Sequence, residues 1–395
     1  MGIKLLNKFL RNNCPDIFEQ VHISEYSYKK VSVDVSLYLC KFKSIAGDRW
    51  LSMFLNLIAC LRKNEVHCVM IYDNGAPPEK NAERKERAAQ RAKVEERVYK
   101  LEEAIEKYHL TCEVDPLLVS FYQKKKKASD VRKRLLGKED TTVDMNFVIA
   151  EVEKMRSNIL EINPGDFELT KKLFDILNVP YYDAPLEAET MCADLCKRNI
   201  VDAVLSEDTD VLAYGAPIFL SKINTHDGTC VRIKYAELLE KLDLFDREFL
   251  DLCIMCGTDY NKNIFRVGPE KAYKYIQKHS SIEEISMNTT VDVKILNHVR
   301  GRELFREYEQ KDIKVPYCGP PDFQKLSEFI FKHNIKCSVE GLKKCFVHST
   351  TIIFDEEDVE EVNDKEDEEI TIEVETSEGE REKAQRIDIS FKNIL

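Results

Sequence analysis

The sequence lacks the features that mark membrane and secreted proteins. No run of about eighteen apolar residues occurs in the chain, so we expect no membrane span and no membrane partner. The first residues contain no hydrophobic segment followed by a small-residue cleavage site, so secretion is not expected. The thirteen cysteines are odd in number and show no framework spacing. These absences favour reduced thiols inside a cell.

Several catalytic motifs are missing as well. No pair among the eight histidines has metal-ligand spacing, and the chain contains neither a Gly-x-Ser-x-Gly motif nor a Walker A loop. Cys253 and Cys256 form a lone C-x-x-C pair, which we interpret as two buried thiols on an apolar helix. A zinc hydrolase, a serine hydrolase and a P-loop ATPase therefore lose support.

Negative charge is concentrated at one end of the chain. The formal net charge is −12, but residues 355–383 alone hold sixteen acidic and three basic residues. Residues 1–354 are therefore about neutral, and the overall acidity does not argue against a polyanionic partner. An acidic, polar run of this kind cannot bury a core, so we predict a disordered tail over residues 355–395.

The apolar pattern predicts an α/β fold. Continuous apolar runs at Val31–Asp34, Val66–Asp73 and Val201–Asp208 suit strands of a mostly parallel sheet that is covered on both faces. Before residue 185, the other predicted elements are a helix near Trp50–Arg62, a long charged helix over 79–109, a helix over Phe167–Asn178 and a short strand over Val179–Asp183. Next comes a helix that has Pro185 in its first turn and carries Glu187 and Glu189. A short helix and a β segment follow before 223, and from Tyr235 to about 345 the chain is predicted to be mostly helical.

Acidic residues gather at the strand ends and helix starts of this predicted fold. Ligands of such sheets bind beyond the carboxyl ends of the strands, so acids at these positions are placed for chemistry. Several converging carboxylates repel one another unless cations hold them together. The seven acids are Asp34, Asp73, Glu187, Glu189, Asp208, Asp210 and Asp259.

Hard oxygen ligands of this kind suit Mg²⁺ or Mn²⁺. Two such ions can activate water and stabilise the leaving oxygen of a phosphodiester. Any single acid could instead cap a helix or lie on a solvated face, but this alternative is weak for the whole set. Helical residues two apart point about 200° from each other, so Glu187 and Glu189 are not both expected to bind one ion directly. The same holds for Asp208 and Asp210 if their turn is helical.

Basic residues follow the second acidic strand. Lys80, Arg84, Arg87 and Arg91 are spaced by four, three and four, which places them on one helix face close to Asp73. Arginine can fork onto phosphate oxygens, and lysine supplies a point charge. The alternative is a solvated helix whose neighbouring glutamates neutralise the stripe.

Two further basic segments could hold a polyanion. Lys124–Lys127 and Arg132–Arg134 form one cluster, for which a solvated loop is the alternative. Val267 and Gly268 form a tight turn before a helix whose amides and dipole suit a phosphate. Lys271, Lys274 and Lys278 share one face of that helix and could add phosphate contacts.

The acidic motifs, taken in order, resemble those of the flap endonuclease family, within the RAD2-like group that includes the xeroderma pigmentosum group G nuclease. The resemblance spans residues 1 to about 345 and is specific. It is carried by Met1–Leu6, Val33–Ser36, Tyr72–Pro78, Asp183–Glu189, Ser206–Leu212, Gly257–Tyr260 and Val267–Ala272.

This resemblance implies a PIN-like sheet flanked by helices, with a helical arch and a helix-hairpin that binds DNA. It implies that the seven carboxylates ligate two Mg²⁺ ions, with Mn²⁺ as a substitute. It also implies that Lys80 and Arg87 contact the scissile phosphate. The expected parts are an N-terminal nuclease region over 1–109, an arch insertion over 110–160, an internal region with the hairpin over 161–290, a helical part over 291–354 and the tail.

The implied activity is structure-specific cleavage of DNA with flaps or 5′ ends during replication and repair. We expect a 5′-flap endonuclease, with 5′–3′ exonuclease activity as a second expectation. The expected enzyme is a monomer in the nucleus, or at a cytoplasmic site of DNA replication for a large-DNA-virus member. The alternatives are a nuclease for junctions, bubbles or RNA, and a non-catalytic DNA-binding subunit, which the complete carboxylate set disfavours.

Two parts of the chain depart from the family pattern. Arg266 stands where the family usually has glycine, which puts the backbone turn at that point in question. The segment Gln385–Phe391 resembles a sliding-clamp motif, but Asp388 and Lys392 occupy positions where apolar and aromatic residues are expected. Clamp binding is therefore not predicted.

Overall fold

The computed structural model describes residues 2–129, 143–157, 159 and 162–346. These residues all fall within one compact unit, Met1–Ser349. The predicted tail over 355–395 and the basic residues Arg132–Arg134 lie outside the described residues, and the division of the rest into regions stays a prediction. No helix in the described ranges combines the length and the apolar character needed to cross a membrane.

A seven-stranded sheet forms the centre of the fold, with strand order β1-β7-β6-β5-β2-β3-β4. The five strands from β6 to β4 run parallel, whereas β7 pairs antiparallel with both β6 and β1. The predicted mostly parallel sheet is therefore confirmed. The strands are β1 Glu19–His22, β2 Lys30–Asp34, β3 His67–Tyr72, β4 Tyr181–Asp183, β5 Ala203–Leu205, β6 Ile218–Ser221 and β7 Thr229–Lys234.

Strand β3 shows why the central strands are apolar throughout. Val69 and Ile71 enter the core on one face of the sheet, whereas Cys68 and Met70 enter a separate core on the other. Side chains alternate between the faces of a strand, so a strand that is covered on both faces needs an apolar residue at every position. All six residues of β3 are buried.

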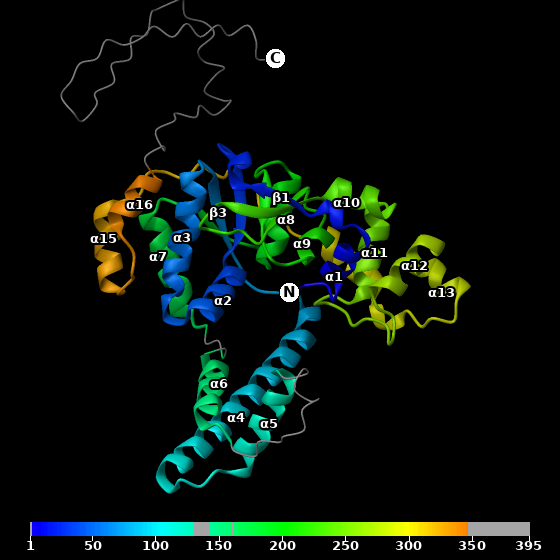
Figure 1. Cartoon of the computed structure of the whole chain (residues 1–395). Helices are drawn as coiled ribbons and strands as arrows, with labels where there is room; N and C mark the ends of the chain where they lie inside the picture. The colour runs from blue at the N-terminus through cyan, green and yellow to red at the C-terminus, as the bar shows by residue number, and fades with distance from the viewer. Residues whose placement is uncertain (1, 130–142, 158, 160–161, 347–395) are drawn as a thin grey trace, which may run out of the picture. The chain divides into compact units, whose positions relative to one another are not determined.

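Helices cover both faces of the sheet (Figure 1). One core is formed with α1 Leu6–Asn13, α8 Ala188–Lys197, α9 Asp210–Ala213, α10 Tyr235–Leu242, α11 Asp246–Cys256, α12 Pro269–His279, α13 Ile282–Asn288 and α14 His298–Arg306. The other is formed with α2 Val35–Ala46, α3 Trp50–Lys63, α7 Pro164–Ile176, α15 Phe323–Lys332 and α16 Val339–Cys345. The predicted helical stretch after Tyr235 is confirmed.

Three helices between β3 and α7 form a small core of their own. The long charged helix is α4 Asn81–Thr111, and it follows a 3₁₀ turn, η4 Pro78–Lys80. Its second half packs on α5 Pro116–Ser129 and α6 Met145–Ser157 through Val98, Leu101, Phe121 and Val148. The first half of α4 carries the basic stripe and exposes most of its residues.

The prediction that Pro185 lies in the first turn of the Glu187 helix is wrong. Helix α8 begins at Ala188, and Glu187 is its extended N-cap residue. The chain before α8 is held beside the end of β3, because Ala184 N–H donates to Tyr72 O at 2.8 Å and Asn74 N–H donates to Leu186 O at 2.8 Å. These bonds between distant segments replace the first helical turn.

Candidate active site

Strand register brings three acidic segments to one edge of the sheet. Strand β2 lies between β5 and β3, with Val33 opposite Leu205 and Asp34 opposite Ile71. Because these strands are parallel, their carboxyl ends meet at the same edge. Asp34 ends β2, and Asp73 and Asp208 follow β3 and β5 within a few residues.

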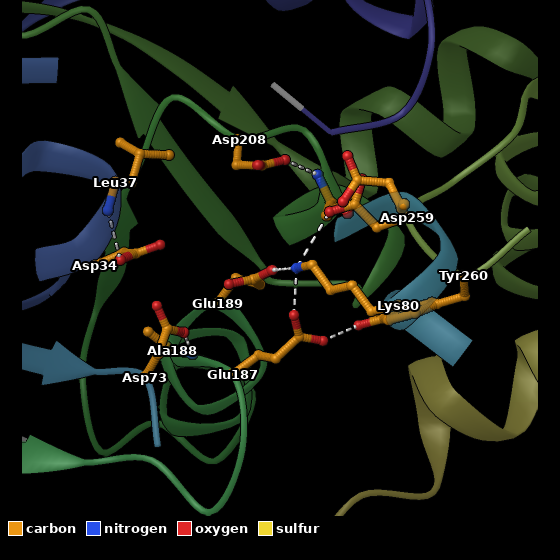
Figure 2. Close-up of polar contacts among 12 residues, drawn as sticks. Asp34, Leu37, Asp73, Lys80, Glu187, Ala188, Glu189, Asp208, Asp259 and Tyr260 are labelled. Carbon is orange, nitrogen blue, oxygen red and sulfur yellow. Dashed lines mark hydrogen bonds and ion pairs between the residues drawn. The ribbon is translucent and has the colours of Figure 1, made fainter. Parts of the chain in front are cut away.

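Two of these acids also accept hydrogen bonds from backbone N–H groups in the first turn of a helix. Asp34 is the N-cap of α2, and its Oδ1 accepts the N–H of Leu37 at 3.0 Å. Asp73 Oδ1 accepts the N–H of Ala188, the first residue of α8, at 2.7 Å. The capping alternative is thus correct for one oxygen of Asp34, but both bonds also fix a carboxylate at the same edge of the sheet (Figure 2).

The ammonium of Lys80 lies at the centre of the acidic cluster (Figure 2). It forms an ion pair with Glu187, and its Nζ lies 3.5 Å from Glu189 Oε1 and 3.1 Å from Asp259 Oδ2. Burial alone would lower the pKa of Lys80, but Glu189, Glu187 and Asp259 together raise that pKa well above its usual value. Lys80 is therefore held as a cation among the carboxylates.

Glu187 and Glu189 both reach this one ammonium, contrary to the geometry expected for two helical residues. Glu187 has an extended backbone, with φ −98° and ψ 138°, and only Glu189 belongs to α8. The 200° separation therefore does not apply to the pair. Both side chains are buried, with 3% of Glu187 and 7% of Glu189 exposed.

Asp208 and Asp210 form the third acidic segment. Asp208 Oδ1 accepts the N–H of Asp210 at 2.9 Å, and Asp210 is the first residue of α9. Burial raises the pKa of both carboxyls, and the charge of Asp208 adds to the shift at Asp210. Asp210 Oδ1 is fully buried and has no hydrogen-bond partner among the described residues.

The N-terminal segment packs directly on this third acidic segment. Gly2 has φ +83°, and a Cβ at this position would lie 2.0 Å from Asp208 Oδ1 and 2.7 Å from Asp210 Oδ1. Such contacts exclude a side chain, so only glycine fits here. The acidic loop and the start of the chain therefore form one packed unit.

Arg87 is the second cation of the site. Its Nη2 donates to Asp259 Oδ1 at 3.0 Å, and its Nε forms an ion pair with Glu83. Nearly half of its side chain, 46%, is exposed. The other members of the basic stripe lie farther along: Arg84 donates to Gly75 O at 3.4 Å, and Arg91 is exposed.

The donor set fits a divalent cation by its chemistry. Every acid supplies hard carboxylate oxygens, and an ammonium already serves as the central cation. In the part of the chain that the structure describes, Asp210 Oδ1 has no hydrogen-bond partner. Within the described residues, however, no three acidic, cysteine or histidine side chains are grouped as a ready-made metal site. Three of the acids, Glu187, Glu189 and Asp259, instead surround the Lys80 ammonium.

Comparisons with known proteins agree with this architecture. The XPG N-terminal domain model matches residues 1–94, and the XPG I-region model matches residues 178–259. A probable RAD2-like endonuclease of Invertebrate iridescent virus 6 is 34% identical and covers 92% of this chain and 97% of the relative. The chain belongs to the RAD2-like endonuclease family. Flap endonuclease 1-A of Sorghum bicolor is 29% identical over 85% of this chain and 83% of the relative.

Solved structures support the fold of this RAD2-like nuclease. The catalytic core of Rad2, solved in complex with DNA substrate, has a TM-score of 0.60 at 16% identity and covers 88% of this chain and 99% of that one. Flap endonuclease-1 from Methanococcus jannaschii has a TM-score of 0.54 at 20% identity, covering 84% of this chain and 95% of that one. At such identities the likeness shows the PIN-like fold alone, as the sequence predicted.

The predicted helix-hairpin begins at α12. Gly268 is the N-cap residue of α12, and Lys271, Lys274 and Lys278 are exposed along the helix. Val267 is buried, and its N–H donates to Ile264 O at 3.0 Å. The amide of Val267 is therefore already used within the protein, which leaves Gly268 and the lysines of this set as the predicted phosphate contacts.

Arg266 keeps the backbone conformation that suits glycine. Its φ is +61°, in the left-handed region, although it has a side chain. The guanidinium lies 5.1 Å from the ring centre of Phe265, which is 82% exposed. The departure from the family pattern thus changes the side chain of this turn and leaves the left-handed turn in place.

Two functional side chains were not singled out from the sequence. Tyr260 OH donates to Glu187 Oε2 at 2.5 Å, and the hydroxyls of Tyr214 and Tyr260 lie 2.5 Å apart. Tyr260 directly follows Asp259, so its place in the acidic motif was a usable signal. Nothing in the sequence links Tyr214 to Tyr260, because their contact is formed only in the fold.

The turn at Arg266 generates a prediction. Arg266→Gly should change the free energy of unfolding by less than about 1 kcal/mol, because relief of the left-handed conformation offsets the added flexibility of glycine. Arg266 is exposed two residues before Gly268, so we also propose that its guanidinium contacts a phosphate of duplex DNA. On that proposal, Arg266→Gly should reduce the slope of log affinity against log salt by about 0.9, as expected for one lost phosphate contact. Denaturant unfolding and binding isotherms at several salt concentrations measure the two effects.

Lys63→Gln is the matched control, because Lys63 ends α3 at the amino end of the sheet, opposite the acids. An unchanged salt slope in Arg266→Gly would remove Arg266 from the DNA contact. A stability loss of several kcal/mol would show that the side chain supports the turn.

Proposed function

We propose that this RAD2-like nuclease is a divalent-metal-dependent, structure-specific DNA endonuclease that cleaves 5′ flaps, with 5′–3′ exonuclease activity on DNA ends. The observation that carries the proposal is the meeting of seven carboxylates with Lys80 and Arg87 at the carboxyl edge of a parallel sheet. Cleavage of a phosphodiester needs both water activation and charge neutralisation at the phosphate. This edge offers groups for both.

We assign the metal-holding role to the acids Asp34, Asp73, Glu187, Glu189, Asp208, Asp210 and Asp259. Two Mg²⁺ ions, or Mn²⁺ in their place, would supply Lewis-acid stabilisation and a more acidic water. The protein holds these carboxylates in place through helix caps, strand ends and buried hydrogen bonds. Burial excludes bulk water from several of them, which strengthens every charge interaction at the site.

Lys80 and Arg87 have a second role in this proposal. Each is bound to carboxylates in this structure, and both contact Asp259. If divalent cations neutralised the acids, Lys80 would lose part of its ion pairing and its ammonium would orient a phosphate oxygen. Arg87, which is half exposed, stands ready to form a forked contact with the same phosphate.

A substrate panel tests the activity itself. The full chain should cut a labelled 5′-flap DNA faster than a Holliday junction, a bubble or single-stranded RNA, and EDTA should stop the reaction. Faster cleavage of the junction, the bubble or the RNA would assign the chain to that alternative substrate. No cleavage of any of them in Mg²⁺ or Mn²⁺ would favour the non-catalytic DNA-binding subunit.

Asp210 provides a direct test of the acidic site. Asp210→Asn should reduce flap cleavage by at least about a hundredfold and raise the melting temperature in EDTA, because the amide keeps the shape but relieves repulsion from Asp208. Flap binding should persist. The exposed residue Asp312 supplies the control Asp312→Asn. Wild-type cleavage by Asp210→Asn would remove Asp210 from the metal-holding set.

Lys80 and Arg87 should act mainly on the chemical step. The double variant Lys80→Ala/Arg87→Ala should lower the single-turnover rate by about a hundredfold or more while weakening duplex binding far less. The reason is that the positive charges of Lys80 and Arg87, which this variant lacks, are proposed to stabilise the transition state. The contrasting variant replaces the hairpin lysines 271, 274 and 278 with alanine. It should weaken binding and reduce the salt slope by about 0.9 per lost contact.

Single-turnover rates at saturating enzyme separate these two effects. An unchanged rate in the Lys80→Ala/Arg87→Ala variant would return the basic stripe to the solvated-face alternative.

A further inference from the structure

Buried hydroxyl groups form a chain behind Glu187. Tyr260 OH donates to Glu187 Oε2 at 2.5 Å, and Tyr214 OH lies 2.5 Å from Tyr260 OH. The chain therefore runs from Tyr214 through Tyr260 to Glu187, the N-cap residue of α8.

The direction of the hydrogen bonds follows from the carboxylate. An ionised Glu187 can only accept, so the single hydroxyl proton of Tyr260 points to Glu187. Tyr260 must then accept from Tyr214. Hydrogen bonds aligned in one direction polarise one another, so each donor strengthens the next.

The chain of hydroxyls connects Glu187 to the segments that carry Asp210 and Asp259. Glu187 belongs to the segment before α8, Tyr214 ends α9 four residues after Asp210, and Tyr260 follows Asp259. Glu187 Oε2 is held by Tyr260, so its Oε1 faces the Lys80 ammonium (Figure 2). The side chain of Glu187 is thereby fixed in the rotamer that presents one oxygen to the central cation.

The two rings do not need their hydroxyls in order to pack. Tyr214 lies 4.8 Å and Tyr260 lies 5.2 Å from the ring centre of Phe305, which is fully buried. A phenylalanine at either position would keep these ring contacts. A buried hydroxyl without a hydrogen-bond partner destabilises a fold. The hydroxyls of Tyr214 and Tyr260 have partners, because they bond to each other and Tyr260 also donates to Glu187.

We propose that Tyr214 and Tyr260 are positioning residues for the metal site, acting through the orientation of Glu187. This inference rests on the proposed function, because it assumes that Glu187 holds a divalent cation. Tyr260 acts directly on Glu187, and Tyr214 acts only through Tyr260. On this proposal, the affinity of the acidic site for a divalent cation depends in part on the hydroxyl of Tyr214, which contacts Tyr260 and none of the seven carboxylates.

The test is Mn²⁺ binding to the full chain without DNA, followed by electron paramagnetic resonance or calorimetry. Tyr260→Phe should weaken Mn²⁺ binding about ten- to a hundredfold, as expected when a group that orients a metal ligand is lost. Tyr214→Phe should weaken it by a smaller factor. The double variant should be no weaker than Tyr260→Phe, because Tyr214 acts through Tyr260.

Flap cleavage adds a second readout. The rates of both variants should recover toward the wild-type rate as Mg²⁺ is raised, whereas a purely structural role would change the melting temperature without moving the metal dependence. Tyr235→Phe is the control, since Tyr235 is a largely buried tyrosine that donates to Asp246 at 2.8 Å and packs on Phe249. Its Mn²⁺ affinity should equal that of the wild type.

Two results would overturn the inference while leaving the proposed function intact. One is wild-type Mn²⁺ affinity in Tyr260→Phe, and the other is a fully additive loss in the double variant. If Tyr260→Phe fails to fold, Tyr214→Phe alone decides, and wild-type affinity in that variant overturns the role of Tyr214. No Mn²⁺ binding by the wild-type chain would instead overturn the proposed function and this inference with it.

Discussion

The repulsion among buried carboxylates is the constraint on which the rest of the structure depends. The carboxyl ends of the parallel strands meet at one edge, where Asp34 ends β2 and Asp73 and Asp208 follow β3 and β5. Burial raises the pKa of Asp34, Glu189, Asp208 and Asp210, which is the direction expected when charged forms are costly. The fold offsets this cost with helix-start hydrogen bonds, with the ammonium of Lys80 and with the buried hydroxyl of Tyr260. Each of these interactions also fixes a carboxylate in place.

The N-terminus of helix α8 takes part in all three kinds of interaction. Its first N–H is donated to Asp73, its N-cap residue Glu187 meets Lys80 and Tyr260, and its second residue Glu189 meets Lys80. A shift of α8 would therefore disturb the strand ends, the central cation and the tyrosine pair together. This is why substitutions at Tyr214, outside the acidic set, are informative about the site.

Much of the fold could be predicted from the sequence, because buried parallel strands leave a clear pattern. Strand β3 contains the continuous apolar run Cys68–Tyr72, since its alternate side chains enter two different cores. Strand β2 contributes Val31 and Val33 to one of these cores. Strands β1 and β7 were not predicted. Both are only partly buried, so they lack the continuous apolar run of the central strands.

The candidate site was predicted in composition but not in geometry. The seven acids follow motifs along the chain, yet the extended backbone at Glu187 depends on bonds to the chain after β3. The position of Lys80 among the acids and the contact between Tyr214 and Tyr260 depend on side chains more than forty residues apart meeting in the fold. The metal ions and the choice of DNA structure stay predictions.

The central claim is that the Lys80 ammonium, which pairs with Glu187, Glu189 and Asp259 in this structure, would compete with the divalent cation proposed for these carboxylates. The most direct measurement is Mn²⁺ titration of the full chain carrying Lys80→Met, with the melting temperature in EDTA measured in parallel. Without the ammonium, Mn²⁺ should bind more tightly than in the wild type, and the metal-free protein should be less stable. Unchanged or weaker Mn²⁺ binding in Lys80→Met would contradict the account.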